Sequence, residues 1–386
     1  MKRRVLLLSP VPTHPQTAGN RTRVGSLLQT LLELGYDVTF LHARQEEGDD
    51  LDMRQIWGQA YKSIGYAWPL ARYDTRLKRK LFGRFSADAK YAVHIDEWYD
   101  PALDSELSEL HRLAPFHAVI ASYVFFSRAL LNFGPEVRLI IDTHDAFANR
   151  HRQYLAHGET PKWFSTTPRG EGIAFDRADL VFAIQDREKK EFAKLTRTPV
   201  VTLGHITPVD PLASVANGRI LFVASDNGIN VHGINHFINN IFPAIRQQIP
   251  SAVLVIAGSV CRSLAEGEGI KLLGRVDDLR STYADSSVVI NPVQFKTGVA
   301  IKNLEALGYG KPLVTAVIGS EGMEAGRGTA YLAAQTDDEF ASQVVSILMD
   351  RAFSEELSRH ALAYITNCNQ TIRDELIRAI GPEHAT

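Results

Sequence analysis

The 386-residue chain is poor in cysteine and has no long apolar run. Its two cysteines, Cys261 and Cys368, have neither metal-ligand spacing nor the pattern of a disulfide framework, so a reducing cytoplasm is expected. No apolar stretch approaches the roughly 20 residues that a helix needs to span a bilayer. The start, MKRRVLLLSPVP, is basic and then apolar, but Pro10 interrupts it and no small-residue cleavage site follows. We therefore interpret it as a buried strand rather than a signal peptide.

The chain also lacks an excess of charge of either sign. Lys and Arg number 42, and Asp and Glu number 44, which argues against a protein that coats nucleic acid. No spacing of His, Cys, Asp or Glu supports a metal site. With 45% hydrophobic residues, a chain of this length can build an ample core, and we expect two domains.

Strand-like and helix-like segments alternate along the chain in two series, which predicts an α/β fold with two Rossmann-like, doubly wound domains. Glycines and prolines within Leu203–Asn217 interrupt any periodic pattern, so the break is expected there. The predicted domains are residues 1–205 and 206–365, and a final helix region, 366–386, that the pattern allows to return to the first domain. The strand-like segments are residues 4–9, 37–42, 117–121, 138–142 and 180–184, and then 219–224, 252–257, 271–273, 287–291 and 313–318.

The most informative stretch is Val288–Met323, where a buried strand, a polar loop closed by Gly298, a helix and a second strand predict a parallel βαβ unit. Gly298 allows the backbone to approach a ligand closely, and the free amides of the next helical turn favour an anion. Lys302 and Glu305 are three residues apart and share one helix face. A cation there could meet phosphate, and a carboxylate could accept hydrogen bonds from sugar hydroxyls. The sequence thus predicts a nucleotide-sugar site.

The run GVAIKNLEALGYGKPLVT, followed by GSEG, resembles the donor-binding segment of the retaining glycosyltransferases of family four, the group 1 enzymes. The resemblance implies the GT-B fold, in which two Rossmann-like domains face each other across a cleft. It also implies metal-independent transfer of a sugar from a nucleotide-diphosphate sugar, with no cofactor. Many members carry two glutamates eight residues apart, the first touching the donor sugar and the second the ribose. Glu305 matches the second, and Thr297 stands in place of the first.

By the same resemblance, Gly298, Val299 and Ala300 would also contact the donor, and Lys302 would stabilise the departing diphosphate as a catalytic residue. The segment FVASDNGINVHGINHF resembles the opening strand and loop of the family's second domain, so Asp226 and Asn227 would line the cleft. Many relatives place an arginine and a lysine in this loop, and this chain has neither.

The segment LLGRVDDL resembles the place where relatives hold the base, which makes Arg275 and Val276 donor-binding candidates. The alternative is that Val276 begins a helix whose N-terminus Asp277 serves.

In the first domain, Gly19 matches a loop that relatives use to approach the donor phosphate and the acceptor. Arg21 and Arg23 lie in the first helical turn, where cations are disfavoured by about 0.3–1 kcal/mol each, which suggests that an anion normally occupies the site. The alternative is that both arginines pair with carboxylates such as Glu33 or Asp37.

In IIDTHDAFANRHRQ, His144 matches a family histidine that lies near the donor sugar and is a catalytic candidate, with Asp145 beside it as an acceptor candidate. The alternative is a loop histidine satisfied by a neighbouring aspartate.

Residues 61–91 interleave basic and aromatic residues. As a basic helix they could lie on an anionic membrane surface, which would place the protein at the inner face of the membrane, or they could form a solvated face. The predicted partners are a UDP- or GDP-sugar donor and a glycan, lipid-linked or small-molecule acceptor, with no nucleic acid. The alternative function is non-catalytic binding of a nucleotide sugar or glycan by the same fold. A nucleotide-sugar 2-epimerase lacks support in the βαβ segment.

Overall fold

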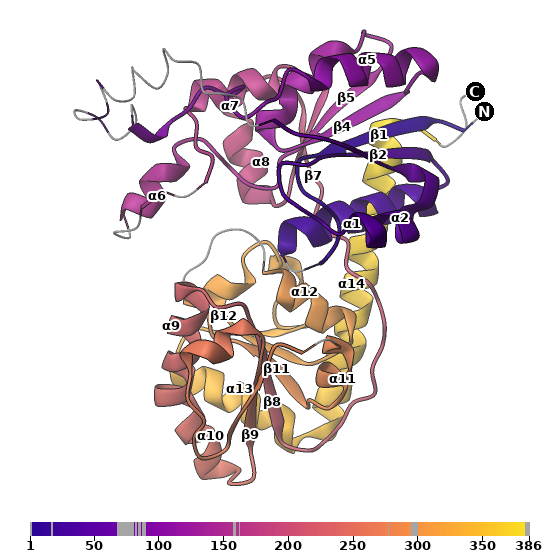
Figure 1. Ribbon diagram of the computed structural model, residues 1–386. Coiled ribbons are helices and arrows are strands. Elements are labelled where there is room, and N and C mark those ends of the chain that lie inside the picture. Colours follow the sequence, from indigo (N-terminus) through magenta and orange to yellow (C-terminus); the bar gives the residue numbers. More distant parts are fainter. Residues whose placement is uncertain are drawn as a thin grey trace. The chain divides into compact units, whose positions relative to one another are not determined.

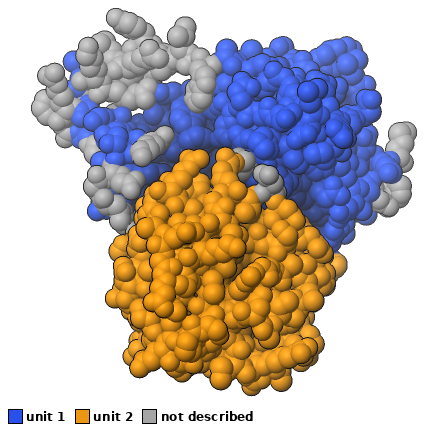
Figure 2. Space-filling model, turned by 60° about the horizontal axis from the view of Figure 1, so that its bottom comes forward, with its two compact units in different colours: residues 1–206, 372–386 blue, residues 207–371 orange. Residues whose placement is uncertain are grey.

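The computed structural model describes residues 2–16, 18–67, 81, 83, 86, 90–156, 160–161, 163–276, 278–294 and 300–382. It divides into two compact units, coloured separately in Figure 2: unit 1 is residues 1–206 with 372–386, and unit 2 is residues 207–371. The chain therefore leaves unit 1 once and returns to it within the last helix, α14 (Arg351–Ile380).

Unit 1 is built on a seven-stranded sheet in the order β3-β2-β1-β4-β5-β6-β7, and every neighbouring pair is parallel (Figure 1). Its strands are β1 (Arg4–Ser9), β2 (Asp37–Ala43), β3 (Tyr61–Ile64), β4 (Ala118–Ser122), β5 (Arg138–Asp142), β6 (Leu180–Ala183) and β7 (Val200–Thr202). Its α-helices include α1 (Gly19–Glu33), α2 (Asp50–Trp57), α5 (Leu103–Leu113), α6 (Arg150–Ala156), α7 (Pro168–Phe175) and α8 (Asp186–Phe192).

Two edge strands of this sheet were not predicted. The basic segment 61–91 begins not as a helix but as β3, which pairs with β2, because the buried Tyr61 packs on Phe40 with ring centroids 5.8 Å apart. Most of that segment, including residues 68–80, lies outside the described residues, so the membrane contact stays a prediction. The other strand, β7, has only three residues and abuts the predicted break.

Unit 2 is built on a six-stranded sheet in the order β10-β9-β8-β11-β12-β13, again parallel throughout. Its strands are β8 (Arg219–Val223), β9 (Val253–Ala257), β10 (Ile270–Gly274), β11 (Val288–Asn291), β12 (Leu313–Ala316) and β13 (Leu332–Ala334). Its helices include α9 (Gly228–His236), α10 (Phe242–Gln248), α11 (Leu279–Ala284), α12 (Ile301–Gly308), α13 (Asp337–Met349) and the first part of α14.

The central strands of unit 2 are buried on both faces. Along β8, Ile220 and Phe222 join one hydrophobic cluster and Leu221 the other, because successive side chains point to opposite faces. Helices α9, α10 and α13 complete the first cluster, and α11, α12 and α14 complete the second (Figure 1). Because both faces of these strands are buried, they appear in the sequence as continuous apolar runs.

Each sheet has one point where the strand order reverses direction, between β1 and β4 in unit 1 and between β8 and β11 in unit 2. The connections on the two sides of such a point diverge, and ligands of open α/β sheets bind there, beyond the carboxyl ends of the strands. In unit 2, this places the loop after β8 beside the start of α12.

The end of α12 buries a lysine. Gly310, with φ +68°, ends the helix in a Schellman motif, since the N–H of Lys311 bonds to the carbonyl of Ala306 and that of Gly310 to Leu307. The Lys311 side chain is 1% exposed. Its Nζ donates to three carbonyl oxygens, those of Ala213 (3.0 Å), Ser286 (3.2 Å) and Ala284 (3.3 Å). Burial lowers the pKa of Lys311 to about 8.

This lowered pKa predicts that part of the stability depends on pH. Between pH 8 and 10.5, the folded protein binds fewer protons at Lys311 than the unfolded chain does, so the free energy of unfolding should rise with pH in that window. Relative to Lys311→Met, the wild type should gain on the order of 1–3 kcal/mol across it. Urea unfolding below pH 8 and near pH 10.5 measures this difference. Lys271→Met, at an exposed position of β10, is the control, and an equal gain in both comparisons would contradict the prediction.

Candidate functional site

The loop after β8 is an ordered polar turn at the reversal point of unit 2. Asn227 caps α9, because its side-chain oxygen accepts the N–H of Asn230 at 2.9 Å. Asp226 is exposed, with its N–H donating to Ser259 Oγ (2.9 Å) and its carboxylate accepting from Ser263 (2.8 Å). The two predicted donor-binding residues therefore stand at the start of α9 in a turn held by their neighbours.

Lys302 extends from the first turn of α12 toward this loop. Its Nζ donates to Asn230 Oδ1 at 3.1 Å and lies 4.5 Å from the centroid of the Phe222 ring. Ala300 stands at the N-cap position and offers no side-chain cap. The structure thus brings Lys302 together with the loop after β8. Asn230, which joins the two by also donating to the carbonyl of Ser225 (2.9 Å), was not singled out from the sequence, although it lies in a quoted motif.

Glu305 lies one turn further along α12 and is largely buried. The hydroxyl of Tyr283, from α11, donates to Glu305 Oε2 at 3.0 Å. Burial raises the pKa of Glu305, although this hydrogen bond partly opposes the shift. Among the described residues, no basic side chain forms an ion pair with Glu305. The side chain is thus a half-satisfied acceptor, with Oε2 engaged by Tyr283.

Three further donor-binding candidates, Thr297, Gly298 and Val299, lie outside the described residues. Arg275 is exposed just after β10, while Val276 packs against the second core cluster of unit 2. The suggestion that a helix begins at Val276 with Asp277 at its N-terminus is wrong, because α11 begins three positions later, at Leu279. Its cap is Asp278, whose carboxylate accepts from the amides of Arg280 (2.9 Å) and Ser281 (3.3 Å).

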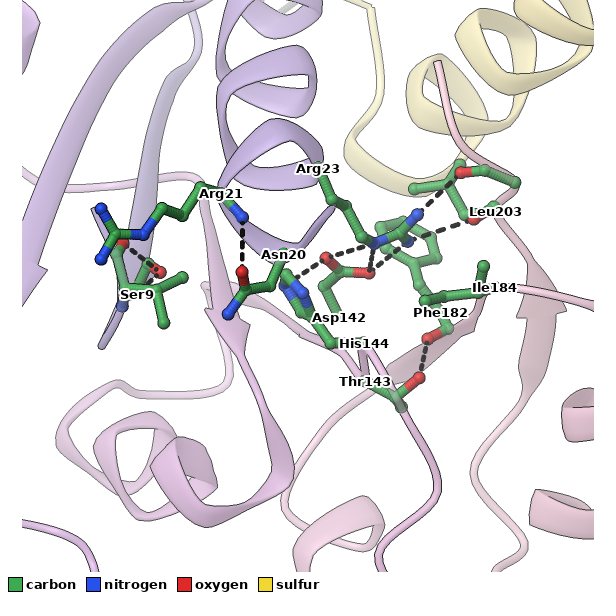
Figure 3. A network of polar contacts seen from close by, with 12 residues as sticks. Ser9, Asn20, Arg21, Arg23, Asp142, Thr143, His144, Phe182, Ile184 and Leu203 are labelled. Carbon is green, nitrogen blue, oxygen red and sulfur yellow. Dashed lines mark hydrogen bonds and ion pairs between the residues drawn. The ribbon is translucent and has the colours of Figure 1, made fainter. Parts of the chain in front are cut away.

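In unit 1, the first turn of α1 meets the end of β5 through a buried ion pair. Asp142 is 0% exposed and Arg23 is 5% exposed. The Arg23 guanidinium holds both carboxylate oxygens, at 2.5–3.2 Å, and also donates to the carbonyls of Gly204 (2.8 Å) and Leu203 (3.1 Å), as Figure 3 shows. Burial alone would raise the pKa of Asp142, but the Arg23 guanidinium, with His144 beside it, holds this pKa well below its usual range.

The two arginines in the first turn of α1 led us to expect a bound anion. Instead, carboxylates of the protein itself pair with both arginines. Arg23 pairs with Asp142 and Arg21 with Glu46 (3.4 Å), rather than with Glu33 or Asp37, which pair with Arg373 and Arg4. The sequence could not reveal this, since Asp142 lies 119 positions from Arg23. Gly19, the first residue of α1, is exposed. Its contact with a ligand stays a prediction.

His144 follows β5 in an unusual backbone conformation. Its φ is +60°, and Tyr123, beyond the end of β4, has φ +70°. Their rings stack with centroids 4.2 Å apart. The His144 side chain is 3% exposed, and its Nε2 lies 3.1 Å from Asp142 Oδ2 (Figure 3). Positive φ at residues other than glycine costs roughly 1–3 kcal/mol each and gathers at functional sites.

The loop around His144 therefore has the signature of a functional site, although its histidine is held by a neighbouring aspartate. Asp145 is paired with Arg150 at 2.5 Å, yet burial raises the pKa of the Asp145 carboxyl. Whether His144 or Asp145 contacts a substrate stays a prediction. Tyr123 was missed because a lone tyrosine after an apolar strand carries no sequence signal.

Two further searches covered the described residues alone. Within them, no three His, Cys, Asp or Glu side chains gather in a way that could hold a metal ion. None of the helices in that part of the chain is both long enough and apolar enough to cross a membrane.

Comparison with known proteins gives the class of the fold. Residues 217–350 match the family model described as "Glycosyl transferases group 1". A protein of Klebsiella pneumoniae, named an uncharacterized 44.6 kDa protein in the cps region, is 22% identical over 94% of this chain and 95% of its own.

Two solved structures extend the likeness to nearly the whole chain. The pneumococcal O-GlcNAc transferase GtfA, in complex with UDP and GlcNAc, has a TM-score of 0.64 at 11% identity and covers 98% of both chains. HepE of Anabaena, in complex with UDP and glucose, has a TM-score of 0.61 at 14% identity, covering 96% of this chain and 98% of its own. The predicted GT-B class, with two parallel α/β sheets and their helices, is confirmed.

The Arg23–Asp142 pair yields a test of what holds unit 1 together. Arg23→Met leaves a carboxylate buried without its cation and should lower the free energy of unfolding by about 3–5 kcal/mol at neutral pH. Because the pKa of Asp142 is depressed in the folded state, the wild-type advantage is present above the unfolded value of 3.8 and is lost as the pH falls below it. Urea unfolding measures both effects.

The matched control is Arg21→Met, because the side chain of its partner Glu46 is 28% exposed. Its loss should stay below about 1 kcal/mol. Equal losses of unfolding free energy for Arg23→Met and Arg21→Met would show that the buried pair does not stabilise unit 1 more than the exposed pair does.

Proposed function

We propose that the protein is a retaining, metal-independent glycosyltransferase that takes its sugar from a UDP-sugar and passes it to a glycan, lipid-linked or small-molecule acceptor. The observation that carries the proposal is the position of Lys302 and Glu305 on α12, at the reversal point of the unit 2 sheet, inside the segment that matches group 1 glycosyltransferases. UDP is preferred over GDP because the complexes of GtfA and HepE hold UDP.

The chemistry requires a site that tolerates growing negative charge. As the bond between the sugar and the diphosphate breaks, charge builds on the departing phosphate oxygens, and fixed donors in a partly dry site stabilise it most. Lys302 supplies a positive charge beside the start of α12, where unsatisfied amides favour an anion. The loop after β8 supplies neutral or acidic groups in place of the basic pair of many relatives, so Lys302 carries most of this role.

Glu305 is proposed to hold the ribose. A carboxylate with one oxygen bonded to Tyr283 has the other available to accept from a sugar hydroxyl. Asp226, Asn227, Arg275 and Val276 are proposed to line the same donor site. In unit 1, His144 is proposed to act at the reacting sugar and Asp145 at the acceptor.

The direct test is release of free UDP from a panel of UDP-sugars, with and without extracts that supply acceptors. Release that depends on an acceptor supports transfer. Tight binding of UDP-sugars with no release under any condition would instead support the non-catalytic binding protein. Binding of GDP but not UDP, by calorimetric titration, would overturn the choice of base.

Lys302→Ala should abolish transfer and weaken UDP binding by about fivefold to a hundredfold, because the diphosphate loses a charged hydrogen-bond donor. The free energy of unfolding should fall by no more than about 2 kcal/mol, the value of a partly desolvated cation–π contact, because Phe222 is buried. Calorimetric titration with UDP and thermal unfolding measure the two effects. Lys271→Ala, an exposed lysine of β10, is the control. Unchanged affinity with full turnover would show that other groups bind the phosphate.

Glu305→Gln should weaken UDP binding by about tenfold, because a ribose hydroxyl that donated to a carboxylate would meet a neutral amide. The fold should be unaffected, because the side-chain carbonyl oxygen of glutamine can accept the hydrogen bond from Tyr283. Titration with UDP and with uracil separates loss of the ribose contact from loss of the base contact. Glu268→Gln, whose side chain is 86% exposed, is the control. Equal UDP affinity in all three proteins would contradict the ribose role.

A further inference from the structure

The loop that carries His144 is fastened by a carboxylate from another helix. Glu171, in the first turn of α7, is 0% exposed. Its Oε1 accepts the backbone N–H of Phe147 at 2.7 Å, and its Oε2 accepts that of Ala148 at 2.9 Å. Each carboxylate oxygen thus binds one amide, and the two amides belong to consecutive residues, the first of them three positions after His144.

This loop needs such a fastening because its backbone is strained. His144 and Asn149 have φ of +60° and +56°, on either side of the two amides that Glu171 holds. Conformations of this kind persist only where the surroundings impose them. The stacking of His144 on Tyr123 fixes one end of the loop, and the bonds between Asn149, Phe147 and Thr166 fix the other. Glu171 holds the stretch between them.

The two hydrogen bonds that Glu171 accepts depend on whether its carboxyl group is ionised, and nearby charges influence that ionisation. Burial is the main cause that raises the pKa of Glu171, to about 7, and the neighbouring carboxylates of Asp145 and Glu188 add to it. Arg150 is paired with Asp145, so it offsets part of that charge. The ionised carboxylate accepts at both oxygens, whereas the protonated group turns one oxygen into a donor, which an N–H cannot match.

Resting on the proposed function, we propose that Glu171 is a positioning residue for the transfer reaction, which holds the His144 loop in its strained, active conformation through the amides of Phe147 and Ala148. Nothing in the sequence singled it out, because a glutamate in a first helical turn is ordinarily read as a favourable end charge. Its effect on the reaction passes through His144 and not through contact with the substrate.

The test compares Glu171→Gln with Glu188→Gln. Glutamine keeps the size of the protonated side chain and offers a single acceptor. Glu188 is the matched control, since it is buried and accepts a backbone N–H at 3.2 Å, but from Ile184. Hydrogen exchange at the amides of Phe147 and Ala148 is measured from pH 6 to 8 and corrected for the intrinsic exchange rate. In parallel, kcat, KM and UDP affinity are measured over the same range.

Glu171→Gln should lower the protection of both amides about tenfold at pH 8 and lower kcat about tenfold, with UDP affinity unchanged. In the wild type, the protection of both amides and kcat should fall together as the pH drops through 7. In Glu171→Gln, neither quantity should show this dependence on pH. Glu188→Gln should keep this dependence on pH but move it to lower pH, because the variant removes one of the carboxylate charges that raise the pKa of Glu171.

Unchanged protection in Glu171→Gln, or loosened amides with full kcat and an unaltered pH profile, would overturn the inference while the proposed function stands. A wild type that transfers no sugar from any UDP-sugar would defeat the proposed function, and the positioning role with it. In that case the exchange data still decide whether Glu171 fastens the loop.

Discussion

The ion pair between Arg23 and Asp142 is the interaction on which the candidate site of unit 1 depends. It joins the first turn of α1 to the end of β5, and the same guanidinium binds the carbonyls of Leu203 and Gly204, just before the chain leaves the unit. Removing two opposite charges from water is costly unless each is fully bonded. Arg23 meets this condition for Asp142, because its guanidinium binds both carboxylate oxygens. The Nε2 of His144 lies 3.1 Å from the same carboxylate, so the histidine packs directly against the ion pair.

Unit 2 has the same architecture, but its candidate site is held by hydrogen bonds between polar side chains and the backbone. The loop after β8 is held by a side-chain cap and by hydrogen bonds: Asn227 caps α9 and Asn230 links the loop to Lys302. The buried Lys311 lies beyond the C-terminal end of α12, and its ammonium donates to three carbonyl oxygens. Lys311 and the proposed phosphate-binding Lys302 thus lie nine positions apart, and they differ in whether the ammonium is enclosed by backbone carbonyls or directed toward the loop after β8.

The fold was largely accessible from the sequence, and the contacts within the site were not. Strands such as β1, β5 and β8 were predicted within a residue or two because, in a doubly covered sheet, buried strands are continuous apolar runs. The edge strands β3, β7 and β13 were missed, since they are short and only partly buried. Of the site, the α12 residues were predicted because their spacing sets a shared helix face. The contacts of Arg23 with Asp142, of His144 with Tyr123 and of Phe147 with Glu171 form only in the tertiary fold, and no local pattern encodes such pairs. The aspartate near His144 was the exception, since it lies two residues away and was named as an alternative.

The path of the chain has a consequence for its synthesis. Ile372, Leu376 and Ile380, at the end of α14, belong to the hydrophobic core of unit 1, whose first strand is β1. On the ribosome, the unit that begins first is therefore completed last, after all of unit 2 has emerged. Until then, the nascent sheet of unit 1 exposes the apolar surface that α14 will cover. Loss of only the last fifteen residues would leave that surface uncovered in the finished protein, so a late stop codon would damage the amino-terminal half of the molecule.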